Sequence, residues 1–399
     1  MADQNDADER GKATVDRRSY LKFAGAAGLA AGTTSLLGGT AAAATIDLGE
    51  EGLEDGDSID GYLEDHFQNG NEVHIPPGDY DWYGGGLSGD YSNAALIGDG
   101  EPGAVRFHHP EGEYRYNAIR AQSGEVRLQN ITIRGATGGE EAKLRAEARG
   151  EDATMVLDKV WLPDGVVEGD DAVGLYVGAD HAGTIEFIDC YVEGFSDNGL
   201  YASGPGAGFD DAEDGRVIVE GGLYKNNNIS NLRLGSSNSV AREVTLVHDG
   251  PSPPNDGVWN QRNLRIRQPG ENIVVENCDI YHDMDSYYPV DMSSQFSGGS
   301  GVIRNTRIYT NSSSMAIGNH GSGWSAENVH LTGDGSFDIG ISASGTVTGS
   351  GAQQATDKPR IPILDYAGRD GGPSGSSDGG DDLPDMDPHL VTFISSADA

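Results

Sequence analysis

A strand-like motif that occurs eight times along the chain constrains the fold more than any other feature of the sequence. In each copy, apolar residues alternate with polar ones around a fifth position that is often Asn or Asp, and the copy at residues 217–224 fits after a slip of one residue. Such alternation indicates strands rather than helices. The fifth positions are Asn130, Lys159, Asp189, Gly221, Glu243, Asn277, Asn305 and Asn328.

The spacing of these copies varies between 22 and 34 residues. Repeats of this length predict a β-solenoid, because each turn buries its inward side chains only by stacking on the next turn. A β-propeller would have a more regular repeat, and a β-sandwich would have none. We therefore predict an all-β fold, a right-handed parallel β-helix.

A short amphipathic helix is expected at residues 58–69, where Ile59, Leu63 and Phe67 share one face with Tyr62. Such a helix would cap the open end of the solenoid. The segment at residues 73–80 follows it and resembles the first strand of pectate-lyase-like β-helices. This resemblance extends over roughly residues 58–349, and it implies a fold rather than an activity.

The N-terminal segment resembles a twin-arginine export signal. Arg17 and Arg18 are followed by an aromatic residue, Leu21 and Lys22, and then by a weakly apolar stretch that ends in small residues. The resemblance implies passage through the Tat translocase, removal of residues 1–44 and an extracellular or cell-surface location. An uncleaved anchor is the alternative, but the stretch is a poor membrane span, and none is expected in the mature protein.

The mature chain carries all of the net charge of −38. Residues 1–44 hold five acidic and five basic residues, so their removal leaves 59 acidic residues and 21 basic ones. Molar salt shortens the Debye length to roughly 3 Å and would screen this repulsion. The composition therefore resembles that of a secreted haloarchaeal protein, and nucleic acid is not an expected partner because no basic stripe exists to meet phosphates.

The domain organisation that we predict has four parts. Residues 1–44 are the signal, 45–367 the β-helix, 368–388 an acidic Gly/Ser/Asp linker, and 389–399 the start of a truncated or disordered segment. Residues 140–149 are expected to form a charged helical insertion between turns.

The two cysteines occupy equivalent repeat positions three turns apart. Cys190 and Cys278 would then be separated by about 14 Å, which is too far for a disulfide. We expect two buried thiols and no zinc site.

A second strand follows each repeat and suggests where function lies. Its outer residues are apolar and should point inward, so that the middle residue points outward from one face. Tyr side chains in this position can stack on sugar rings, and Arg can bind a uronate carboxylate. A solvated face whose side chains merely align is the alternative. The predicted outward column is Tyr176, Tyr201, Arg233, Arg265, Asp291 and Ile317.

Two loops near this column add further candidates. The loop at residues 248–262 contains Asp256 and Trp259, and the one at residues 281–288 contains His282, Asp283 and Asp285. Long loops on a rigid scaffold often hold binding residues. An acidic coating typical of halophilic proteins would also explain the aspartates.

Two kinds of catalysis could use these groups. Similarity to polysaccharide lyases of this fold implies Ca²⁺ beside a uronate and an Arg or Lys as the base. The predicted base is Arg233 or Arg265, with Lys225 as a chemically easier one. Tyr176, Tyr201, Trp259 and His282 would bind the substrate, an extracellular polysaccharide. The predicted calcium ligands are Asp256, Asp283, Asp285 and Asp291.

A glycoside hydrolase with paired carboxylates is an alternative, because acids one or two turns apart would match either mechanism of such enzymes. The motifs of β-helical polygalacturonases are not assembled in this chain, apart from a loose similarity at residues 316–323. A non-catalytic glycan-binding or cell-surface protein is the third possibility.

Overall fold

The computed structural model describes residues 44–348, except for residues 111–116, 140–141, 208–210, 293–298 and 320–322. The proposed export signal, apart from its last residue Ala44, and the segments predicted at 368–388 and 389–399 lie outside the described residues. Among the described residues, no helix is long and apolar enough to cross a membrane.

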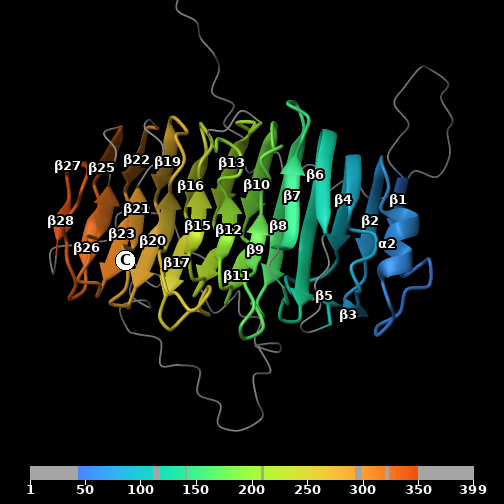
Figure 1. Cartoon of the computed structure of the whole chain (residues 1–399). Helices are drawn as coiled ribbons and strands as arrows, with labels where there is room; N and C mark the ends of the chain where they lie inside the picture. The colour runs from blue at the N-terminus through green and yellow to red at the C-terminus, as the bar shows by residue number, and fades with distance from the viewer. Residues whose placement is uncertain are drawn as a thin grey trace, which may run out of the picture. The chain divides into compact units, whose positions relative to one another are not determined.

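The described chain is an all-β solenoid of about nine turns with parallel strand pairing, which confirms the predicted fold (Figure 1). Each complete turn contributes strands to three faces. The first face contains β1 (Ala44–Asp47), β2 (Asn71–Ile75), the end of β4 (Gly89–Gly98), the middle of β6 (Ala118–Arg134), the start of β8 (Thr154–Leu162), β10 (Thr184–Ile188), β13 (Arg216–Glu220), β16 (Val240–Arg242), β19 (Ile273–Glu276), β22 (Gly301–Arg304), β25 (Trp324–Glu327) and β27 (Ser342–Ser344).

The other two faces follow the same order along the solenoid. The second face contains β3 (Gly78–Asp81), β5 (Val105–His108), the ends of β6 and β8, β11 (Tyr191–Glu193), β14 (Leu223–Lys225), β17 (Thr245–His248), β20 (Asp279–His282), β23 (Arg307–Thr310), β26 (His330–Thr332) and β28 (Val347–Thr348). The third face contains the starts of β4 and β6, β7 (Ala142–Ala148), β9 (Val173–Tyr176), β12 (Asn198–Ala202), β15 (Ser230–Leu234), β18 (Leu264–Ile266), β21 (Val290–Met292) and β24 (Ile317–Asn319).

The fifth position of each repeat forms the corner between the first and second faces. All eight residues have positive φ, between 47° at Asn305 and 66° at Gly221. Asn, Asp and Gly tolerate this left-handed conformation better than other residues, which explains their frequency at the position. Some of the side chains also stabilise the corner, since Asn130 donates a hydrogen bond to the carbonyl oxygen of Gly98 (2.8 Å).

The inward residues of each face stack into a continuous apolar core. On the third face the stack consists of side chains with almost no exposed surface, and burying each one contributes roughly 1.5–3 kcal/mol. Its members are Leu144, Leu175, Leu200, Leu232, Leu264, Val290 and Ile317.

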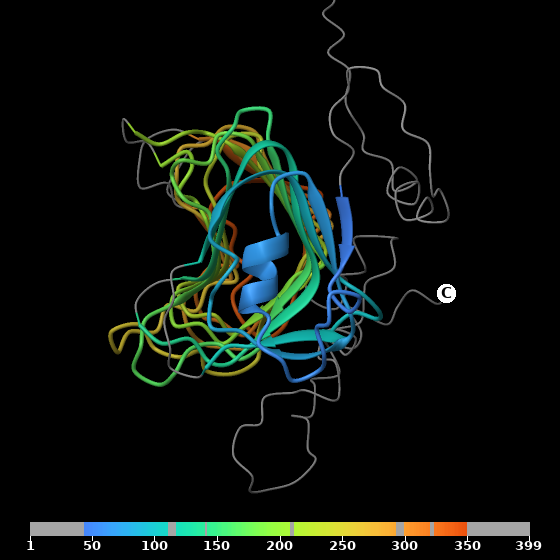
Figure 2. The same cartoon turned by 90° about the vertical axis from the view of Figure 1, so that its right-hand side faces the viewer.

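The predicted cap closes the N-terminal end of the solenoid. Helix α2 (Asp60–His66) lies across this end, as Figure 2 shows. Ile59, Leu63 and Phe67 are fully buried against the first turn, and the Phe67 ring lies 4.6 Å from that of Tyr91. The helix therefore shields the edge of the core from water.

The helical insertion predicted at residues 140–149 is wrong. Residues 142–148 form strand β7, which pairs with β6 and β9 in the third face. The helix-forming composition is overridden because Leu144, Ala146 and Ala148 alternate into the core. The intervening Lys143, Arg145 and Glu147 lie on the opposite side of the strand and are hydrogen-bonded there. Cys190 and Cys278 are buried free thiols, as predicted.

Candidate functional site

The outward column on the third face forms as the alternation predicted, except at its end. Strand register pairs Tyr176 with Tyr201, Tyr201 with Arg233, Arg233 with Arg265, and Arg265 with Asp291. The next member is Gly318 and not Ile317, which pairs with Val290 and is buried. The predicted triplet began at Ala316, one residue too early for the observed strand pairing. The error arose because short apolar residues such as Ala and Ile can occupy either the inward or the outward positions of a strand.

Arginines and one aspartate form the densest part of this column. The Nε atom of Arg262 lies 2.8 Å from the Asp291 carboxylate, and that of Arg265 lies 3.7 Å from it. The Asp291 side chain is only 3% exposed. Arg233 is 8% exposed, and its guanidinium carbon lies 4.2 Å from the centre of the Tyr201 ring.

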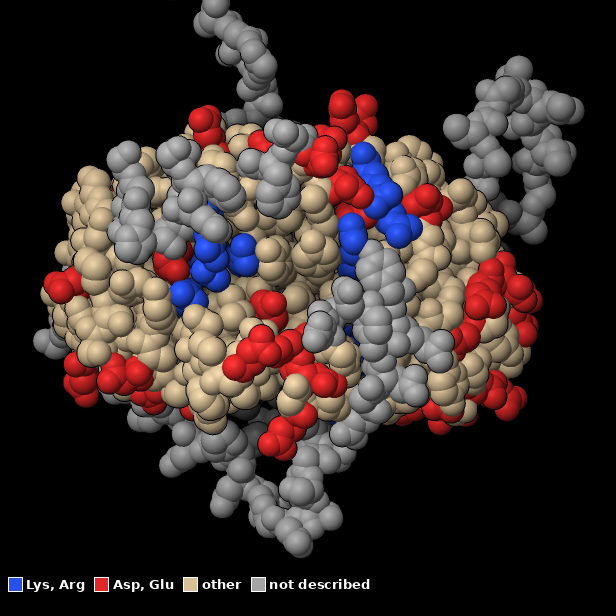
Figure 3. Space-filling view, in the orientation of Figure 1, with Lys and Arg blue, Asp and Glu red and all other residues tan. Residues whose placement is uncertain are grey.

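This arginine cluster, which we define as Arg233, Arg262, Arg265 and Arg267, contains four guanidiniums, two of which lie beside the buried carboxylate of Asp291. Burial, together with the neighbouring guanidiniums of Arg262 and Arg233, lowers the pKa of Arg265 to about 10. Burial also lowers the pKa of Arg233. Figure 3 shows basic side chains gathered in two groups on this side of a protein whose net charge is −38. The site is therefore suited to an anionic ligand.

Asp197 belongs to this site, although no motif in the sequence points to it. It lies directly before β12, close enough to Arg233 and Arg265 to interact electrostatically. Burial raises the pKa of Asp197, and the carboxylate of Asp171 raises it further against the opposing effect of Arg233. Asn198 donates a hydrogen bond to its carboxylate. Alignment of the residues preceding each outward triplet would have brought it to attention.

The loop before β18 supplies an exposed aromatic ring. Trp259 is 55% exposed, and its indole N–H donates to the carbonyl oxygen of Ser252 (3.0 Å), which fixes the ring. Asn228 is hydrogen-bonded to both Val258 and Asn260, and so it attaches the loop to the preceding turn. Such a ring can serve as a stacking platform for a sugar.

A second exposed ring, absent from our sequence prediction, lies before β21. Tyr287 is 41% exposed and stacks on Arg262, whose guanidinium carbon is 3.7 Å from the ring centre. The aromatic residues in the loop at 281–288 were the available signal. Tyr287 and Trp259 thus add two exposed aromatic rings to a site whose other side chains are mostly charged.

His282 does not fit its predicted contact with a substrate. The side chain has no exposed surface, and its Nδ1 atom lies 3.1 Å from the Asn263 amide nitrogen. Its Nε2 atom lies 3.2 Å from the Ser286 hydroxyl, so the ring supports the loop from below. The His282 side chain points inward because His282 is the last residue of β20, a second-face strand whose four residues are all buried.

Lys225 lies on the second face and is a poor base. Its ammonium group is 3.0 Å from the Asp249 carboxylate and 3.7 Å from that of Glu193. Burial lowers the pKa of Lys225, but these two carboxylates outweigh burial and raise the pKa above that of an ordinary lysine. The proton is therefore held more tightly, contrary to the requirement for a base.

The four predicted calcium ligands do not fit a calcium ion. Asn311 donates to Asp283, the backbone N–H and hydroxyl of Ser313 donate to Asp285 (2.9 and 2.8 Å), and Asp291 is paired with arginines. The backbone N–H of Asp256 donates a hydrogen bond to the side-chain carboxylate of Asp171 (3.4 Å). Within the described ranges, no three acidic, His or Cys side chains form a group that could hold a metal.

Neither a known protein-family model nor a curated protein matches this chain. Among solved structures, ORF18 of Geobacillus virus E2 is similar over 76% of this chain and 60% of its own, with 13% sequence identity and a TM-score of 0.43. The chain thus spans less than two thirds of that protein's length. Likeness at this level says nothing about activity, which has to be inferred from the site itself.

Proposed function

We propose that this protein is a carbohydrate-active β-helix that binds a uronate-containing polysaccharide on its third face and cleaves it by β-elimination. The observation that carries the proposal is the alignment of Arg233 and Arg265 on adjacent strands, beside Tyr201. This places two guanidiniums one strand apart, about 4.8 Å, on a rigid sheet. The row suits a planar carboxylate presented next to a sugar ring.

The charge of the whole chain supports an acidic ligand at this place. A net charge of −38 repels a polyanion from most of the surface, so that binding requires a local group of cations. The arginine cluster provides one. Because its guanidiniums are largely buried, bulk salt screens their interaction with a ligand less than it screens surface charges.

The cluster also offers groups for the elimination step. Arg233 would neutralise the uronate carboxylate and so acidify the proton on the adjacent carbon. Arg265, in its neutral form, would accept that proton, and the C–H electron pair would form the new C=C bond as the β carbon–oxygen bond breaks. The leaving oxygen would take a proton from Asp197, whose raised pKa favours the protonated acid. Proton transfers and bond changes then balance without a metal.

The setting proposed for this activity is outside the cell. The N-terminal resemblance to a twin-arginine signal implies export by the Tat translocase, and the acidic composition suits a saline medium. These proposals rest on the sequence alone. A non-catalytic glycan-binding protein would use the same face. It would bind the polymer without forming either unsaturated products or new reducing ends.

Ultraviolet absorbance of the unsaturated uronate product tests the proposal directly. Purified protein in concentrated salt is incubated with polygalacturonate and with alginate, and both absorbance and reducing ends are measured. New absorbance that is lost in Arg265→Gln and in Arg233→Gln supports the lyase. Arg304→Gln is the matched control, because Arg304 pairs with Glu276 on the first face (2.7 Å).

The other outcomes each have a meaning. New reducing ends without new absorbance would show that the protein cleaves by hydrolysis and not by elimination. Binding without either product would indicate the glycan-binding alternative. Absence of binding to both polymers would overturn the assignment to uronates.

A further inference from the structure

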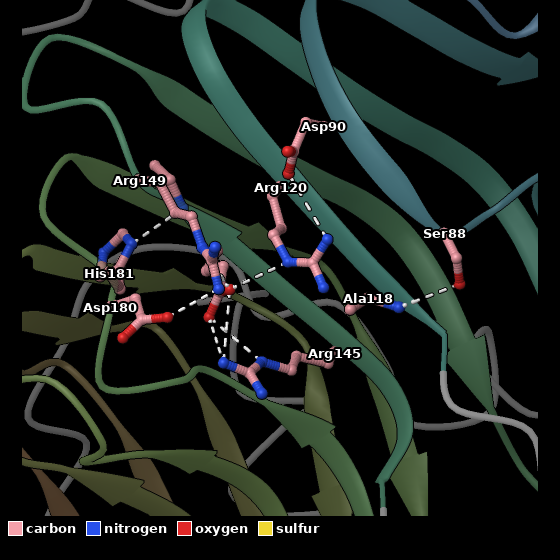
Figure 4. Close-up of polar contacts among 10 residues, drawn as sticks. Ser88, Asp90, Ala118, Arg120, Arg145, Arg149, Asp180 and His181 are labelled. Atoms are coloured by element: carbon pink, nitrogen blue, oxygen red, sulfur yellow. Dashed lines mark hydrogen bonds and ion pairs between the residues drawn. The ribbon is translucent and has the colours of Figure 1, made fainter.

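A second group of arginines lies on the third face, toward the N-terminal end of the solenoid. Figure 4 shows Arg120, Arg145 and Arg149 directed toward one carboxylate between them. That carboxylate belongs to Glu147, which is completely buried and accepts hydrogen bonds from Arg145 (2.9 Å) and Arg149 (2.9 Å). Arg120 lies 3.5 Å from it. We call these three residues the Glu147 arginine group.

Glu147 is the buried carboxylate that all three arginines of this group share. Arg120 and Arg149 also pair with Asp90 (3.4 Å) and Asp180 (2.6 Å), but both aspartates are more than half exposed. Ion pairs that are exposed to water contribute little and are readily exchanged. The three arginine side chains are also 19–33% exposed, so that a further anion can reach them from the solvent.

The two basic groups are connected by an unbroken row of side chains. Arg145 lies 5.4 Å from the ring centre of Tyr176, and the Tyr176 and Tyr201 rings are 5.3 Å apart. Arg233 then stacks on Tyr201. The order along four neighbouring strands is therefore guanidinium, ring, ring, guanidinium, and the two ends are about 14 Å apart.

Both ends of this row are held in place before any ligand arrives. Glu147 and the Tyr176 ring fix Arg145, and the Tyr201 ring fixes Arg233. Side chains that are already ordered lose less entropy on binding. A flexible basic patch would lack this advantage, and it would also lack the aromatic surface between the charges.

From this continuity we infer that both arginine groups bind one acidic sugar chain, which runs along the solenoid axis across β7, β9, β12 and β15. The inference rests on the proposed function and extends it: the ligand is a polymer long enough to reach both groups, and short oligosaccharides occupy only one. Binding at the second group is then intramolecular, which raises the affinity for long chains.

Affinity as a function of chain length tests this inference. Size series of oligogalacturonates and oligomannuronates, from the disaccharide upward, are titrated into the full-length protein by calorimetry. For the wild type, affinity should rise with length and level off once the ligand spans both groups. The expected gain is on the order of a hundredfold.

The variant Arg145→Gln removes the gain for long chains and leaves the affinity for short ones unchanged. This single substitution does not leave Glu147 as an unpaired buried charge, because Arg149 (2.9 Å) and Arg120 (3.5 Å) still pair with it. Circular dichroism and thermal unfolding verify that the variant is folded. Arg242→Gln, on the first face in a pair with Glu220, is the matched control and should keep the full gain.

Failure of the inference differs from failure of the proposed function. If Arg233→Gln abolishes binding and Arg145→Gln shows the wild-type dependence on length, the second anchor is wrong and the proposed site remains. If no oligosaccharide binds the wild type, the proposed function is wrong, and the inference falls with it.

Discussion

The guanidinium of Arg233 stacks on the ring of Tyr201, 4.2 Å from its centre, and the two residues are register partners on adjacent strands. The contact orients an arginine that is almost completely buried. It also ties the aromatic part of the outward column to its basic part.

Tyr201→Ala is expected to weaken binding of an acidic oligosaccharide by on the order of tenfold, because cation–π contacts at desolvated sites contribute about 1–2 kcal/mol. Tyr201→Phe keeps the ring and should bind nearly as well as the wild type. Calorimetric titration measures both. An equal loss in the two variants would show that the hydroxyl matters and not the ring.

Asp291→Ala should destabilise the fold by about 3–5 kcal/mol, because it leaves Arg262 and Arg265 buried without their carboxylate. Glu276→Ala removes the partner of Arg304 in an exposed pair and should cost less than about 1 kcal/mol. Urea unfolding at fixed salt compares the two. Similar small losses would mean that water reaches Asp291.

Acid should destabilise the protein through two buried histidines. His248 and His282 are in edge-to-face contact, with ring centres 5.5 Å apart, and burial lowers the pKa of His248 to about 4 and that of His282 well below its usual value. The unfolded chain binds protons below pH 6.5 and the folded chain does not, so stability falls as the pH drops below 6.5.

For His248 this loss amounts to roughly 3 kcal/mol once the pH reaches 4. Unfolding free energies are measured between pH 5 and 7, because in this range protonation of the unfolded-state histidines changes stability more than protonation of most carboxylates does. The slope should become shallower in His248→Gln. An unchanged slope in that variant would assign the acid sensitivity to other groups.

If Arg265 is the base, the elimination rate of Asp197→Asn, which lacks the titrating acid, should rise with pH up to about 10, where the neutral form of Arg265 becomes abundant. In the wild type this rise is offset, because Asp197 loses its proton as the pH increases. Initial rates are measured from pH 7 to 10, with circular dichroism at each pH to verify that the protein is folded. Asp197→Asn tests the acid at the same time, since it should lower kcat at every pH and leave binding in place. A flat profile in Asp197→Asn would argue against Arg265 as the base.

The corner residues allow a prediction about stability alone. Asn277 has a φ of 54°, so Asn277→Ala should cost about 1 kcal/mol, whereas Asn277→Gly should be nearly neutral. Thermal unfolding measures the difference. Equal stability of the two variants would show that the corner relaxes.

Much of the fold could be predicted because it depends on local patterns. Alternating apolar residues determine which side chains enter the core, and Asn or Gly at the fifth position tolerates the left-handed corner, as at Asn130 and Gly221. The same alternation was enough to align Tyr176, Tyr201, Arg233, Arg265 and Asp291 in one column.

The sequence by itself therefore determined the solenoid, its cap and the outward column, since strand periodicity and corner conformation are properties of neighbouring residues. Only the tertiary structure decided that β7 is a strand, that His282 is buried, that Lys225 sits between two carboxylates, and that Asp197 joins the arginine cluster. Those outcomes depend on which turns stack and on how loops of unequal length fold across them. Burial and charge pairing between turns then set the pKa of each group, and no single stretch of sequence contains that information.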